Sequence, residues 1–112
     1  QVPARWFREY MAHDPAADLR AIGCPVLAVT GRKDLQVDVD DLQVIADLVS
    51  APCQVEAPAD LTHLLRSTLD RPAITQYRAL LEQPVDAGLT DLVASWTRDA
   101  SGPSVKPSSP AR

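Results

Sequence analysis

The sequence is poor in three features, and each shortage argues against a class of protein. Its two cysteines, Cys24 and Cys53, have neither the spacing of a metal site nor a CxxC partner. Acidic residues outnumber basic ones 15 to 11, and the net charge of −4 argues against a nucleic-acid partner, because phosphate binding needs a basic surface. No apolar run approaches the length of a membrane span. What remains, 46% hydrophobic and 23% charged residues, is typical of one globular domain of modest core.

The most informative stretch is the nearly continuous apolar run 24–30, which ends at Gly31 and is followed by Asp34. A short apolar run bounded by turn residues predicts a strand buried on both faces, as in parallel sheets. Residues 53–57 predict a second, shorter strand, and the helical pattern between the strands runs to about residue 50. Strand, helix and strand in this order predict a right-handed βαβ unit whose strands end at the same edge of the sheet.

This topology predicts that two chemically useful side chains meet. Asp34 follows the first strand and His63 follows the second, so we expect them to lie within hydrogen-bonding distance. A carboxylate that orients an imidazole makes the imidazole a general base. Asp60 is an alternative acid that is closer to His63 in sequence, but two side chains three residues apart on a loop rarely orient each other well.

Helices are predicted on both sides of this unit, at residues 4–12, 15–22, 64–69, 73–82 and 85–98. The first carries Trp6, Phe7, Tyr10 and Met11 on one broad apolar face, which we expect to pack into a core. From residue 101 the chain is rich in serine and proline, and residues 101–112 are therefore predicted to be a disordered tail. The folded domain is expected to span residues 1–100.

The two cysteines are open to two interpretations. Both fit small buried hydrophobic residues, which is the interpretation we favour. Each also begins one of two adjacent parallel strands, whose backbones lie about 5 Å apart, a separation compatible with a disulfide if the side chains share a face.

Several segments together resemble the α/β-hydrolase family, over nearly the whole chain up to residue 99. They are Trp6-Phe7, Asp14-Pro15, Cys24-Pro-Val-Leu27, Gly31-x-x-Asp34-Leu-Gln-Val37 and His63-Leu64. In that family an acid follows a late strand, a histidine follows the last strand, and a serine in Gly-x-Ser-x-Gly lies upstream of both. The sequence contains no Gly-x-Ser-x-Gly motif. The resemblance therefore implies an α/β fold that is the C-terminal part of an α/β-hydrolase, with two parallel strands and flanking helices.

The same resemblance implies a carboxylic ester or acyl hydrolase that uses a Ser-His-Asp mechanism and no cofactor or metal. Asp34 and His63 would be its catalytic residues, and a side chain of helix 4–12 could line an acyl pocket. The nucleophile and the oxyanion hole would belong to a missing N-terminal portion of the same domain. The expected partners are that portion and a small-molecule ester or acyl substrate, and the isolated chain is expected to be inactive. One departure is the loop 59–62, where relatives usually carry a glycine and often an asparagine before the histidine.

A second hypothesis comes from another class of function. The strand at 24–30 is expected to have one unpaired edge, and its apolar side chains are unusual for an edge that faces solvent. A non-catalytic α/β module could bind a protein partner through such an exposed sheet edge.

Overall fold

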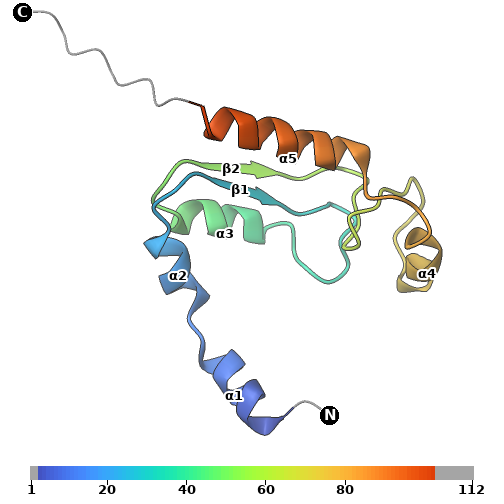
Figure 1. Cartoon of the computed structure of the whole chain (residues 1–112). Coiled ribbons are helices and arrows are strands. Elements are labelled where there is room, and N and C mark those ends of the chain that lie inside the picture. The colour runs from blue at the N-terminus through green and yellow to red at the C-terminus, as the bar shows by residue number, and fades with distance from the viewer. Residues whose placement is uncertain (1–2, 103–112) are drawn as a thin grey trace, which may run out of the picture.

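Two parallel strands, β1 (Val26–Val29) and β2 (Cys53–Glu56), form the centre of the molecule (Figure 1). The computed structural model describes residues 3–102 of the chain. The α/β class and the parallel pairing predicted from the sequence are confirmed, although both strands are shorter than expected. All four residues of β1 are half-buried, so the prediction of a strand buried on both faces was wrong.

Helices cover both faces of this small sheet. The crossover helix α3 (Asp41–Leu48) packs against β1 and β2 and buries Leu42, while α2 (Pro15–Ala21) packs on α3. The longest helix, α5 (Ala87–Ala100), lies along the opposite face of the sheet (Figure 1). Its first turn is capped by Asp86, whose carboxylate accepts a hydrogen bond of 2.8 Å from the amide of Leu89.

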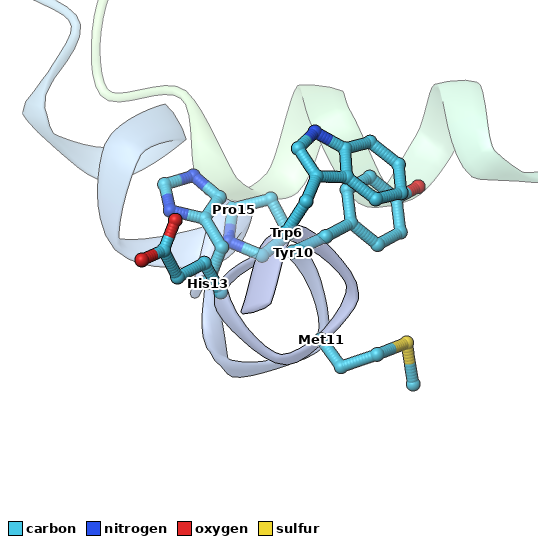
Figure 2. Close-up of a pocket in the computed structure, with 6 residues that line it drawn as sticks. Trp6, Tyr10, Met11, His13 and Pro15 are labelled. Carbon is cyan, nitrogen blue, oxygen red and sulfur yellow. The ribbon is translucent and has the colours of Figure 1, made fainter. Parts of the chain in front are cut away.

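The N-terminal helix α1 (Ala4–Ala12) has the bounds that the sequence predicts, but its apolar face is not covered. Figure 1 shows α1 extending away from the sheet. Trp6 and Tyr10 stack with their ring centroids 5.2 Å apart and remain 53% and 65% exposed (Figure 2). The prediction that this face packs into the core was therefore wrong for the described residues. Amphipathic spacing shows that a helix has an apolar face, but it does not say which segment covers that face.

The segment that follows β2 folds differently from the prediction. Residues 64–69 form no helix; Leu61 instead pairs with Ser67 in an antiparallel bridge, and the chain between them reverses direction. Leu65 has a φ of 60°, a left-handed backbone conformation that is incompatible with a right-handed helix. Farther on, a short 3₁₀ turn (Ile74–Gln76) leads into α4 (Tyr77–Leu80), within the predicted range 73–82.

Few apolar side chains are buried, and much apolar surface is open. The buried ones are Leu42, Val49, Leu61, Leu80 and Leu89. Within residues 3–102, β1 pairs only with β2, so its second edge is unpaired, as predicted. An apolar groove runs between β1 and α5 and is lined by Leu27, Val29, Leu89, Val93 and Trp96.

Neither interpretation of the cysteines fits the structure. Cys24 is exposed and Cys53 half-buried, and both are free thiols. The register of the strands explains this, because Cys53 lies opposite Val26, two residues beyond Cys24. Of the predicted tail, only Ser101 and Gly102 lie within the described residues. Among residues 3–102, no helix combines the length and apolar character needed to cross a membrane.

Gly31 lies two residues beyond the end of β1, at a point where two backbones come unusually close. A Cβ atom built at Gly31 overlaps the carbonyl group of Leu61 and lies 2.8 Å from the Cβ atom of Leu61. We expect Gly31→Ala to lower the free energy of unfolding by roughly 1–3 kcal/mol, because rigid backbone must move to admit the methyl group. Chemical denaturation measures the effect. Gly23→Ala is the control, since nothing lies within 4 Å of a Cβ there; equal stability of the two variants would contradict the close approach.

Candidate active site

The loops that follow β1 and β2 run side by side, as if the parallel pairing continued beyond the strands. Three backbone hydrogen bonds of 3.0–3.1 Å join them, from the amides of Thr30, Arg32 and Lys33 to the carbonyls of Glu56, Pro58 and Leu61. Because the two loops are held together in this way, side chains that are distant in the sequence lie next to each other immediately beyond the sheet.

The contact predicted between Asp34 and His63 is present. Oδ2 of Asp34 lies 3.0 Å from Nδ1 of His63. The other carboxylate oxygen of Asp34 accepts hydrogen bonds from the backbone amides of Gln36 at 2.7 Å and Val37 at 3.0 Å. Only 8% of the Asp34 side chain is exposed, and backbone amides of its own loop hold one carboxylate oxygen while the other faces the histidine.

The environment of Asp34 determines which atom of the pair carries the proton. Burial raises the pKa of this carboxyl, but hydrogen bonds from the Gln36 amide, the His63 imidazole and the Val37 amide outweigh burial and hold the pKa below its ordinary value. Asp34 is therefore ionised at neutral pH and can only accept hydrogen bonds. Nδ1 of His63 must then be the donor, which leaves Nε2 of the neutral ring as an acceptor.

Nε2 is the open side of the pair. The side chain of His63 is 37% exposed, and no group within residues 3–102 forms a hydrogen bond with Nε2. An imidazole with an ionised carboxylate at Nδ1 and a free Nε2 can take a proton from a nucleophile and return it to a leaving group.

The turn that carries His63 is tightly fixed. Thr62 is 1% exposed, and both its amide and its hydroxyl donate to the carbonyl of Arg66, at 3.0 and 2.8 Å. The start of α5 holds the same turn, because the amide of Asp86 donates to the carbonyl of Leu65 at 2.9 Å.

Asp86 also binds the turn through its side chain. Its carboxylate accepts a hydrogen bond of 2.7 Å from the hydroxyl of Ser67. This bond and the amide of Leu89 lower the pKa of Asp86. The sequence suggested a helix start at this position but gave no sign that it anchors the histidine turn.

The alternative acid, Asp60, has a different partner. Its carboxylate lies 2.7 Å from the ammonium group of Lys33, and this pairing explains why it does not orient His63. Lys33 was missed in the sequence, because the only signal for it is the βαβ topology that places the two loops side by side.

Two further findings bear on the site. Residues 3–102 contain no group of three or more histidine, cysteine, aspartate or glutamate side chains placed to hold a metal ion. Comparisons with protein-family models, with curated proteins and with solved structures gave no match.

The lowered pKa of Asp34 makes a prediction for stability against pH. A carboxyl whose pKa is lower in the folded than in the unfolded chain stabilises the fold fully above the unfolded value, 3.8 here, and loses that contribution as the pH falls through the folded value. The stability difference between the wild type and Asp34→Asn should therefore shrink as the pH falls from about 5 to about 2. Denaturant unfolding at a series of pH values measures it. A difference that stays constant would mean that the carboxylate is not stabilised by these hydrogen bonds.

Proposed function

We propose that this chain is the C-terminal part of an α/β-hydrolase domain and supplies the acid and the base of a carboxylic ester or acyl hydrolase. The observation that carries the proposal is the contact between Asp34 and His63 at the adjoining ends of two parallel strands. The acid precedes the histidine in the chain, which is the order that this fold uses.

In the proposed reaction, Nε2 of His63 removes the proton from a serine hydroxyl as the oxygen attacks the acyl carbon. The imidazolium formed in this step is stabilised by the carboxylate of Asp34, which stays ionised. When the tetrahedral intermediate collapses, Nε2 gives the proton to the departing alcohol. A water molecule then repeats the cycle on the acyl-enzyme and releases the acid.

The serines of the described residues do not provide the nucleophile. The hydroxyl of Ser67, the serine nearest to His63 in sequence, donates a hydrogen bond to the carboxylate of Asp86. The hydroxyl of Ser50 faces the carbonyl of Arg20. Ser95 lies within α5 and Ser101 ends it. None of them occupies a sharp strand-to-helix turn, where this mechanism places its serine. The proposal therefore takes the nucleophile from a segment upstream of this chain.

The uncovered apolar surface supports a missing portion of the same domain. The second edge of β1 is free, and the groove between β1 and α5 opens beside it. A further strand paired with β1 would satisfy the free backbone groups of this edge, and its side chains would lie beside Leu27 and Val29. The exposed face of α1 is a second surface that such a portion would cover.

The test is a longer polypeptide that includes the coding sequence upstream of this chain. We expect it to contain Gly-x-Ser-x-Gly, to release p-nitrophenol from p-nitrophenyl esters and to react with a fluorophosphonate probe. The 112-residue chain alone should neither release p-nitrophenol nor react with the probe. A longer polypeptide without the motif and without ester hydrolysis would favour the other hypothesis, a non-catalytic module that binds a protein through the free edge of β1.

A further inference from the structure

Lys33 belongs to the loop after β1 that carries Asp34. It contacts the segment after β2 that carries His63 at three points. Its backbone amide donates to the carbonyl of Leu61 at 3.1 Å. Its ammonium group lies 2.7 Å from the carboxylate of Asp60 and also donates to the carbonyl of Thr68. The side chain is 18% exposed, so it is held within the protein rather than extended into solvent.

The two residues that the ammonium group contacts are the two ends of the hairpin that carries His63. The amide of Thr68 donates to the carbonyl of Asp60 at 3.0 Å and closes the hairpin at its base. Leu61 and Ser67 pair above this base, and His63 lies in the turn at the tip. One lysine side chain thus contacts both arms of the hairpin at its base.

Lys33 is also the residue directly before Asp34. Its backbone therefore fixes the start of the acid's loop while its side chain fixes the base of the histidine's hairpin. A carboxylate and an imidazole hold a 3.0 Å contact only while both loops keep their relative positions. A lysine that is linked covalently to one loop and by charge to the other is well placed to set that distance.

We propose that Lys33 is a positioning residue that clamps the hairpin and thereby holds His63 against Asp34. Asp60 is the anchor of this clamp, because its carboxylate is the charged partner of the Lys33 ammonium group. The importance of Lys33 for catalysis rests on the proposed function, whereas the clamp itself is a property of the chain and can be tested without activity.

The test is the tautomer of neutral His63, measured by nitrogen-15 NMR in the complete 112-residue chain. In the wild type the proton should lie on Nδ1, the atom that faces Asp34. Lys33→Met should lower the ratio of the Nδ1–H to the Nε2–H form at least about fivefold, since a hydrogen bond to a charged group shifts an equilibrium by roughly tenfold or more. Lys33→Arg keeps the charge and should retain most of the wild-type ratio.

Two more variants separate a clamp from other effects. Arg5→Met removes a salt bridge of similar length, 2.8 Å to Glu9 on α1, and should leave the ratio unchanged. Asp60→Ala removes the anchor but keeps the lysine, and it should lower the ratio about twofold. If the charge of Asp60 competed with Asp34 for the histidine, removing it would leave the ratio unchanged or raise it, and that result would overturn the clamp.

The amide spectrum of each variant shows whether the chain is folded. A folded Lys33→Met variant with the wild-type ratio would overturn the proposal, and if this variant does not fold, Asp60→Ala decides. In the longer polypeptide, Lys33→Met should lower kcat by about tenfold with little change in KM, because the clamp orients the base and does not bind substrate. If the variants change the tautomer ratio as expected but the longer polypeptide does not hydrolyse esters, the proposed function is refuted and the clamp is supported.

Discussion

Replacement of His63 by alanine is expected to lower the turnover of the longer polypeptide on p-nitrophenyl esters by roughly 10⁴- to 10⁶-fold. His63 is the only imidazole placed next to a buried, ionised carboxylate in the described residues, and its Nε2 is free to take a proton. Without it, the serine hydroxyl would be left with its ordinary weak nucleophilicity. The substitution should change kcat far more than KM, because a general base acts in the transition state.

The chain contains a matched control for this experiment. His13, the second histidine, also pairs with an aspartate, since its Nε2 lies 2.6 Å from Oδ2 of Asp18. That pair is exposed on the surface, where α1 joins α2, and both side chains are more than half accessible. His13→Ala should therefore leave turnover unchanged. If both alanine variants kept full activity, the hydrolase proposal would be wrong.

The part of the fold that could be predicted is the part encoded locally. Short apolar runs bounded by Gly31 and by prolines predicted both strands, and the helical spacing between them predicted the crossover. Parallel pairing then followed from the helical crossover, because a strand that is reached through a crossover helix on one face of the sheet runs parallel to the first strand. The contact of Asp34 with His63 could be predicted for the same reason, because each residue follows the end of one of two adjacent strands.

The wrong predictions arose where a local pattern was outweighed by more distant contacts. Leu64, Leu65 and Leu69 have a spacing that suits a short helix, yet Thr62 and Arg66 close a turn around Leu65 instead. That turn is also held by α5, about twenty residues farther along the chain. A single window of sequence contains no information about such a contact.

The exposure of α1 is a different kind of error. Trp6 and Tyr10 have the spacing of a helix that packs against something, and the helix formed as predicted. Amphipathicity tells only that an apolar face exists. Whether the cover comes from this chain or from another segment depends on tertiary packing, and among the described residues no element covers this face.

The interactions that fix the site were the least predictable. Lys33 and Asp60 are 27 positions apart, and nothing in their spacing distinguishes them from other surface charges. Charged residues mostly lie on solvated surfaces, so the sequence alone favours no partner for Lys33. The pairing becomes visible only once the two loops are seen side by side.

Asp34→Asn, the second large effect, is expected to lower turnover about 10⁴-fold in the longer polypeptide. The loop of Asp34 gives a specific reason. One carboxylate oxygen accepts from the amides of Gln36 and Val37, and only an oxygen can take that place. The new amide nitrogen must therefore face Nδ1 of His63 and donate to it. Nδ1 then becomes the acceptor, the ring proton moves to Nε2, and the base has no lone pair for the serine.

The test measures both kcat and the tautomer of neutral His63 in the same variant. Nitrogen-15 NMR should show the neutral ring of His63 with its proton on Nε2 in Asp34→Asn, and kcat should fall in the same variant. Asp47→Asn is the control, because this exposed carboxylate on α3 contacts Gln43 and lies outside the site; it should change neither value. A loss of turnover with the proton still on Nδ1 would show that Asp34 acts through its charge alone. A full turnover with the proton on Nε2 would show that His63 is not the base.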